Sequence, residues 1–131
     1  MKTGRTIFWL FVFAAVYDGG LGLVFLLFPT AVFRFFDVTL PNHLGYVQFP
    51  AALLIVFSIM FVAIALRPVE NRNLIPYGIL LKASYCGVVF AYWIVDNIPF
   101  MWKPFAILDL VWGILFYLAY RELSPSKAEE V

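Results

Sequence analysis

Three ionisable residues, Asp18, Lys82 and Asp109, lie inside long apolar stretches of this 131-residue sequence. A charge at membrane depth costs at least about 2.5–3.5 kcal/mol on insertion scales, so such residues normally pair with one another. Two aspartates and one lysine leave a formal charge of −1, which a dry site holds only if one aspartate is protonated or water enters. A protonated carboxyl suits a proton carrier, whereas a buried ion pair can simply fix helix register. We favour the structural lock and keep the working site as the alternative.

The spacing of small residues predicts that the three charges converge. Residues four apart share one face of a helix, and small residues on that face let helices approach closely in lipid. Each charge has such neighbours one turn away: Gly22 after Asp18, Gly78 and Cys86 on either side of Lys82, and Gly113 after Asp109. Tyr85, also close to Lys82, is a candidate hydrogen-bond donor to the group. We therefore expect an intramembrane polar cluster of Asp18, Lys82, Asp109 and Tyr85.

The composition is that of an integral membrane protein. Hydrophobic residues make up 64% of the chain and charged residues 13%, whereas a soluble domain is about half apolar and about a quarter charged. These values exclude a soluble enzyme, a disordered chain and a secreted mini-protein. The net charge of +1 provides no basic field for nucleic acid. Because Cys86 and His43 are the only residues of their types, we expect no disulfide, no redox cysteine pair and no metal site.

Four apolar runs predict the elements that position the charges. They cover about residues 6–28, 47–66, 74–96 and 101–121, and a bilayer span needs about 20 residues. Pro50, Pro76 and Pro104 lie near the starts of the last three, where proline is tolerated in a helix. We read the first run as an uncleaved span, since its apolar stretch is longer than that of a signal peptide. The expected fold is all-α: an integral membrane four-helix bundle forming a single domain over residues 1–131.

The distribution of lysine and arginine predicts the orientation. Positive charges gather on the cytoplasmic side of membrane proteins. In a four-span chain, six of these residues lie on the face of the two termini: Lys2, Arg5, Arg67, Arg72, Arg121 and Lys127. The opposite face carries two, Arg34 and Lys103. We therefore expect a multi-pass protein with both termini cytoplasmic. Measured from the inner ends of their spans, the three charges lie about 18, 12 and 16 Å deep at about 1.5 Å per residue, so they can meet near the midplane.

The connection over about 29–45 and two polar span residues have open interpretations. Residues 31–37 read either as a short amphipathic turn in the membrane interface or as a loop whose aromatic residues dip into the headgroups. The loop residue His43 is interpreted as incidental. Gln48 is a candidate for lining an outer mouth, with a capping or interfacial role as the favoured alternative. Ser58 is expected to bond to the backbone of its own helix.

Two segments of the sequence match each other over ten residues. Residues 18–27 and 109–118 both read Asp, three residues, Gly, Leu or Ile, an aliphatic residue, Phe, any residue, Leu. The two spans run in opposite directions, and inverted repeats are typical of transporters. Coincidence or a shared packing solution is the favoured explanation, because the composition is rich in Leu and Phe.

The sequence resembles the small bacterial four-helix membrane proteins of the DoxX-like kind. The resemblance is carried by Ala14–Asp18 with Gly22, by Gly78–Lys82 and by Leu108-Asp109. It implies a four-helix fold in the bacterial inner membrane. Some proteins of this kind are similar to membrane subunits of quinone-linked oxidoreductases. This chain has no histidine in a span and no cysteine pair to support a redox role of its own.

Three functions remain open from the sequence. The favoured one is a non-catalytic subunit or scaffold of a larger membrane complex, because a small four-span chain offers little interior volume. The alternatives are a small oligomeric proton-linked transporter that uses the Asp/Lys/Asp cluster, and a lipid- or quinone-binding membrane protein. We expect no catalytic residues and no cofactor beyond a bound lipid or quinone. The expected partners are membrane lipids and either other membrane subunits or further copies of the chain, without nucleic acid.

Overall fold

The structure, a computed structural model, describes residues 2–124, with side chains from residue 4 onward. Over this range the chain forms five α-helices and two single-turn 3₁₀-helices, and no strand. The elements are α1 (Lys2–Leu27), α2 (Pro29–Phe35), α3 (Gly45–Leu66), η1 (Arg72–Leu74), α4 (Ile75–Val95), η2 (Phe100–Trp102) and α5 (Lys103–Glu122). The all-α class is confirmed, and four of the described helices are long and apolar enough to cross a membrane.

Prolines mark the starts of three helices. Pro29, Pro76 and Pro104 lie in the first turns of α2, α4 and α5. A proline is tolerated there because the N–H groups of a first turn have no acceptor within the helix. Pro50 lies further inside α3, since this helix begins at Gly45 rather than near residue 47. The predicted spans agree with the four long helices to within four residues at every boundary.

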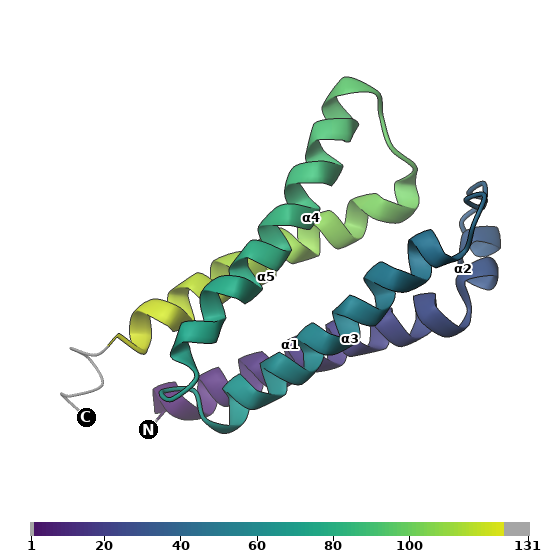
Figure 1. The fold of residues 1–131 in the computed structure, drawn as a ribbon. Coiled ribbons are helices and arrows are strands. Elements are labelled where there is room, and N and C mark those ends of the chain that lie inside the picture. The colour runs from purple at the N-terminus through teal and green to yellow at the C-terminus, as the bar shows by residue number, and fades with distance from the viewer. Residues whose placement is uncertain (1, 125–131) are drawn as a thin grey trace.

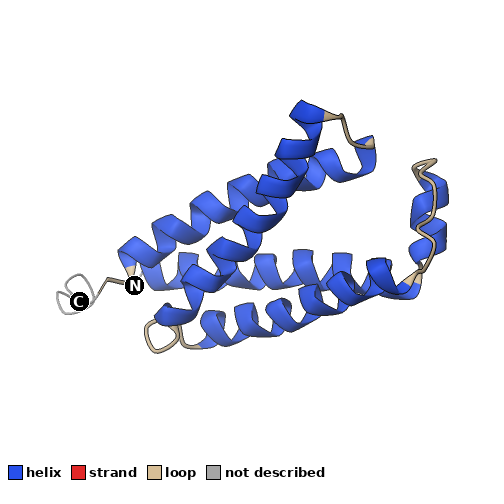
Figure 2. Cartoon of the chain, turned by 45° about the horizontal axis from the view of Figure 1, so that its top comes forward, coloured by secondary structure: helices blue, strands red, loops and turns tan. Residues whose placement is uncertain are grey.

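The four long helices form two antiparallel pairs, α1 with α3 and α4 with α5 (Figure 1). The start of α1, the connection from α3 to η1 and the end of α5 lie at one end of the molecule, which we call the N-terminal end. The helix α2 and the connection from α4 to η2 lie at the opposite end, which we call the α2 end. The two pairs are close together at the N-terminal end and diverge towards the α2 end (Figure 2).

The larger core lies at the N-terminal end, where the two pairs meet. Phe11, Phe61 and Phe116 come from α1, α3 and α5, and all three are 0% exposed. The ring of Phe116 lies 4.9 Å from that of Phe11 and 5.0 Å from that of Phe61, between centroids. Arg72 links the start of α4 to α5 at this end. Its Nε donates to the carbonyl of Tyr120 at 3.0 Å, and its guanidinium lies 3.7 Å from the centroid of the Tyr120 ring. The three phenylalanine rings therefore join the two pairs at this end.

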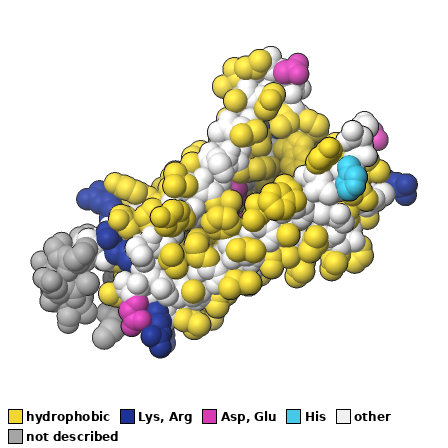
Figure 3. Space-filling view, in the orientation of Figure 1, with side chains coloured by type: hydrophobic (Ala, Val, Ile, Leu, Met, Phe, Trp, Pro, Cys, Tyr) yellow, Lys and Arg dark blue, Asp and Glu magenta, His cyan; other side chains and the backbone are white. Residues whose placement is uncertain are grey.

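The outer surface is apolar along the helices. Figure 3 shows hydrophobic side chains over most of the face in view, with most charged side chains near the ends and one acidic group deep in the middle. Ile94 and Phe35, for example, are 85% and 82% exposed. A water-soluble protein rarely exposes a continuous apolar surface of this extent.

Small and polar residues set the close contact of α1 with α3. A Cβ atom on Gly22 would lie 2.6 Å from the carbonyl oxygen of Ala51, so only glycine fits at this crossing. The hydroxyl of Ser58 donates to the carbonyl of Ala15 at 2.7 Å. The prediction that Ser58 bonds within its own helix is therefore wrong. The two helices are close enough here for the hydroxyl to reach across, and a bond between helices satisfies it equally well.

The two matching sequence segments lie on α1 and α5, which run in opposite directions. Phe25 lies seven residues after Asp18, and Trp102 lies seven residues before Asp109. Their rings stack, with centroids 6.0 Å apart and an angle of 21° between the ring planes. Likewise, Phe11 lies seven residues before Asp18 and Phe116 seven residues after Asp109. Their rings stack, with centroids 4.9 Å apart and an angle of 13° between the ring planes. The two aspartates therefore lie between two equivalent aromatic stacks. This symmetric packing gives the sequence match a structural meaning without a repeat of the whole fold.

The connection after α1 contains the short helix α2, so an ordered helical turn describes part of this segment better than the loop of the other interpretation. Phe33 is buried, whereas Phe35 points away from the protein at 82% exposure. Phe33 packs edge-on against Trp102, with ring centroids 5.9 Å apart. Further along, the Nδ1 atom of His43 accepts a hydrogen bond from the backbone N–H of Gly45 at 2.9 Å. His43 therefore has a local role at the start of α3.

The tight crossing of α1 and α3 can be tested with a matched pair of glycines. Gly22→Ala should lower the free energy of unfolding by about 1–3 kcal/mol, as overpacking does, because α3 must move away from the new methyl group. Gly20→Ala, two residues away, meets no atom within 4 Å and should raise stability by about 0.5–1 kcal/mol, because alanine favours a helix. Thermal unfolding in detergent, followed by circular dichroism, measures both. Equal effects of the two substitutions would contradict the close contact.

Candidate functional site

The structure brings Lys82, Asp18 and Asp109 together in the middle of the molecule. The Nζ atom of Lys82 lies 2.8 Å from each carboxylate oxygen of Asp18 and 3.2 Å from Oδ1 of Asp109. Lys82 and Asp18 are each 1% exposed, and Asp109 is 8% exposed. We call these three residues the charged cluster. Bonds from an ammonium to carboxylates at this length are strong, and stronger where water is excluded.

The charged cluster crosses the boundary between the two helix pairs. Asp18 belongs to α1, whereas Lys82 and Asp109 belong to α4 and α5. The bond between Lys82 and Asp18 therefore joins one pair to the other, and the bond between Lys82 and Asp109 lies within the second pair.

The predicted small residues make room for this contact. A Cβ atom on Gly78 would lie 2.8 Å from the Phe61 ring, so α4 approaches α3 closely there. Gly113 lies beside the Lys82 side chain, where a Cβ atom would meet Cβ of Lys82 at 3.5 Å. The thiol of Cys86 is buried and donates to the carbonyl of Ala106 at 3.1 Å, which ties α4 to α5. The small residues beside the charges thus lie where the helices pack.

Tyr85 is not part of the charged cluster. Its hydroxyl donates to the carbonyl of Trp102 at 2.9 Å, so the expected hydrogen bond to the charges is not formed. Tyr85 lies three residues beyond Lys82 on α4, which directs its ring towards the α2 end. Tyr17 is the closer aromatic neighbour, because its ring centroid lies 5.4 Å from Nζ of Lys82. The Tyr17 hydroxyl is buried without a hydrogen-bond partner among the described residues.

Gln48 caps the end of α1 and does not line the cavity. Its Nε2 atom donates to the carbonyl of Leu26 at 3.2 Å, in the last turn of α1. The last four carbonyls of a helix have no partner within the helix, so a side-chain donor satisfies one of them. The capping interpretation therefore describes Gln48, and the outer mouth does not include it.

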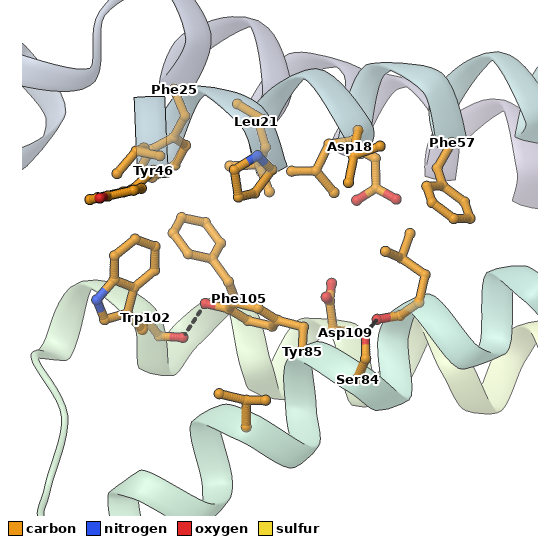
Figure 4. A pocket seen from close by; sticks show the side chains of 17 residues that line it. Asp18, Leu21, Phe25, Tyr46, Phe57, Ser84, Tyr85, Trp102, Phe105 and Asp109 are labelled. Carbon is orange, nitrogen blue, oxygen red and sulfur yellow. Dashed lines mark hydrogen bonds between the residues drawn. The ribbon is translucent and has the colours of Figure 1, made fainter. Parts of the chain in front are cut away.

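A cavity of about 550 Å³ lies between the two helix pairs, on the α2 side of the charged cluster. Its walls are almost entirely apolar, and Asp18 and Asp109 lie at its inner end. Figure 4 shows the two carboxylates pointing towards each other across the space, with Tyr85, Trp102 and Phe105 nearer the α2 end. The other lining residues are Leu21, Phe25, Tyr46, Val47, Pro50, Ala51, Leu53, Leu54, Phe57, Leu81, Ser84 and Val88. No pattern in the sequence indicates this cavity, because it arises from the divergence of the two helix pairs.

The cavity is open on one side and closed at its inner end. In Figure 3 it is a hollow between α3 and α4, with an acidic group at its bottom. Towards the N-terminal end, the buried rings of Phe11, Phe61 and Phe116 fill the space beyond the charged cluster. A molecule therefore reaches the carboxylates from the open side between α3 and α4.

The cavity combines a long apolar wall with a polar inner end. Asp109 receives one hydrogen bond, at Oδ1, and no described residue donates to its Oδ2. The described residues contain no group of three or more His, Cys, Asp and Glu side chains that could hold a metal ion. The site is therefore suited to holding an amphipathic molecule by its polar group.

Comparison with models of protein families, with curated proteins and with solved structures gives no match to this chain. A function has to be inferred from the site itself.

The ion pair can be tested by comparing single and double substitutions. Lys82→Met leaves two buried carboxylates without a counter-charge and should lower the free energy of unfolding by about 3–5 kcal/mol. Adding Asp18→Asn to Lys82→Met removes one of these charges and should restore part of the loss. Asp109→Asn alone should have the smallest effect, because it keeps the shorter bonds between Lys82 and Asp18. Unfolding by SDS in mixed micelles measures the three variants against the wild type. Equal stability of the Lys82→Met single and double variants would contradict the pairing.

Proposed function

We propose that this chain is an integral membrane four-helix bundle that binds a lipid-soluble amphipathic molecule. The observation that carries the proposal is the apolar cavity between the two helix pairs, whose inner end consists of the buried charged cluster. Its volume of about 550 Å³ falls within the range of about 300–1,000 Å³ that is typical of small-molecule sites. Such sites combine mostly apolar walls with a few polar groups that fix the orientation of the ligand.

The position of the opening suits a ligand that arrives from the bilayer. The cavity opens between α3 and α4, which are both apolar along their length. In a membrane this opening faces the lipid tails, so an apolar molecule can enter sideways without crossing water. We place the N-terminal end in the cytoplasm, in line with the bias of positive charges, and α2 in the opposite membrane interface. This binder is the third of the functions that the sequence left open.

A second candidate is the non-catalytic subunit or scaffold, for which the same opening provides an observation. Apolar side chains of α3 and α4 border the cavity without a partner from this chain; Leu53 and Val88, for example, are 40% and 57% exposed. A transmembrane helix of another subunit would cover them. The resemblance to DoxX-like proteins agrees with either function. The volume of the cavity removes the original reason for preferring the subunit over the binder.

The proton-linked transporter has less support from the geometry. A carrier has to expose its site to both sides of the membrane in turn. Between the charged cluster and the N-terminal end, the structure has the buried rings of Phe11, Phe61 and Phe116. The cluster is therefore open to one side only in this conformation, which suits binding better than passage.

Filling the cavity should displace the bound molecule. Ser84 lines the cavity and is exposed, so Ser84→Trp should fill the space without disturbing the core. Gly87→Trp is the matched control, because Gly87 lies on α4 outside the cavity and has no atom near its Cβ position. Native mass spectrometry and extraction of the purified protein should find a bound amphipathic molecule in the wild type and in Gly87→Trp. Ser84→Trp should retain several-fold less of it.

The same purification separates the binder from the subunit. A wild-type chain that elutes with another membrane protein, and carries no small molecule, would replace the binder with the subunit. Equal amounts of small molecule in the two tryptophan variants would show that the molecule lies elsewhere.

The proposed orientation predicts which residues reagents reach from each side. In a Cys86→Ala background, cysteines at Gly4 and Glu70 should react with an impermeant maleimide only from the cytoplasmic side. A cysteine at the exposed Asp96, in the connection after α4, should react only from the opposite side. Labelling of intact cells and of inverted vesicles measures both. Reaction of positions 4 and 96 from the same side would refute the topology.

A further inference from the structure

We propose that the molecule held in the cavity is an organic monovalent cation with apolar, preferably aromatic, substituents. The proposal rests on the binding function above and names the class of ligand. Its basis is the juxtaposition of an acidic cluster, a carboxylate oxygen to which no described residue donates, and a set of aromatic rings around one space.

With both aspartates ionised, the charged cluster has one negative charge more than it has positive charges. Asp18 and Asp109 carry two carboxyl groups, and among the residues whose side chains the structure describes, Lys82 is the only positively charged one that contacts them. Nearby candidates to balance the surplus are absent: the other described basic residues lie towards the ends of the molecule, as with Arg72 in η1 and Lys103 at the start of α5. A surplus charge in an apolar space is costly unless it is paired. A cation in the cavity would complete the pairing.

Asp109 is the residue that offers its charge to the cavity. Asp18 is bonded through both oxygens to Lys82, whereas Asp109 is bonded through Oδ1 alone, at the longer distance of 3.2 Å. Asp109 is 8% exposed and lines the cavity, and its Oδ2 accepts no hydrogen bond from a described residue. Figure 4 shows its carboxylate pointing away from α5 into the space. A cation in the cavity would therefore contact Asp109 before any other charge.

The walls near this carboxylate suit an organic cation better than a metal ion. The rings of Phe57, Tyr85, Trp102 and Phe105 line the cavity, and aromatic faces attract cations electrostatically. A hydrated metal ion requires several oxygen ligands, which these walls do not provide. An ammonium or phosphonium with apolar substituents satisfies the carboxylate and the walls together.

Two compounds of nearly the same shape and different charge test the proposal. Methyltriphenylphosphonium is a cation, and triphenylphosphine oxide is its neutral counterpart, with oxygen in place of the methyl group. The full chain is placed in nanodiscs of zwitterionic lipid, and binding of tritiated forms of both is measured by scintillation proximity, with empty nanodiscs subtracted. The wild type should bind the cation saturably and at least about tenfold more tightly than the oxide, as expected for a desolvated charge pair.

Variants assign the preference to Asp109. Asp109→Asn should weaken binding of the cation about tenfold or more and leave binding of the oxide unchanged, which removes the preference. Asp96→Asn, which alters an exposed acid outside the cavity, should behave like the wild type. Ser84→Trp leaves the charged cluster intact and should abolish binding of both compounds. This variant keeps the test decisive even if Asp109→Asn does not fold.

The outcomes separate this proposal from the one on which it rests. If the wild type binds the oxide as tightly as the cation, and Ser84→Trp blocks both, the cavity is a binding site but the cationic ligand is wrong. A cation preference that persists in Asp109→Asn also overturns the cationic proposal. If neither compound binds, or if Ser84→Trp changes nothing, the binding function itself is overturned.

Discussion

The fold depends on the bond between Lys82 and Asp18, because it is a buried ionic contact that joins the two helix pairs. The amine lies 2.8 Å from both carboxylate oxygens, and both residues are 1% exposed. Once two charges are taken out of water, separating them costs far more than separating apolar side chains of the same size. This contact therefore fixes how far each pair can slide or rotate against the other. In lipid, where helices gain little from the hydrophobic effect between themselves, such polar contacts carry more of the specificity.

The cavity follows from where the two pairs are joined and where they are not. At the N-terminal end the two pairs are held together by the packing of Phe116 against Phe11 and Phe61. At the middle they are held by the charged cluster. Beyond it, α1 still meets η2 through the stack of Phe25 on Trp102, but α3 and α4 have separated. An apolar space results, with a charged inner end. The same cluster thus supports the fold and gives the cavity its polar group.

Much of this could be predicted from the sequence, and the failures share one cause. The helices follow from apolar length and proline position, and the meeting of the three charges follows from the cost of leaving them unpaired. Small residues one turn away indicated which faces pack. The partners of Tyr85, Gln48 and Ser58 were wrong or left open, because each side chain reaches a backbone carbonyl of another helix or segment. Side-chain type shows that a donor needs an acceptor, but not which carbonyl a neighbouring helix presents. The cavity was missed for the same reason, since it depends on the angle between the pairs.

The central claim is that the amine of Lys82 is bonded directly to an aspartate carboxylate between the two helix pairs. Solid-state NMR on the chain in lipid bilayers, labelled with ¹⁵N at the lysine amines and ¹³C at the aspartate carboxyls, tests it most directly. Among the ion pairs of residues 4–124, whose side chains the structure describes, only those of Lys82 join a lysine to an aspartate. We predict strong ¹⁵N–¹³C dephasing that requires direct contact, as expected for the N···O distances of 2.8 Å to Asp18, and its loss in Lys82→Met. An absence of dephasing in the wild type would contradict the account, because the two helix pairs would then lack the contact on which their arrangement depends.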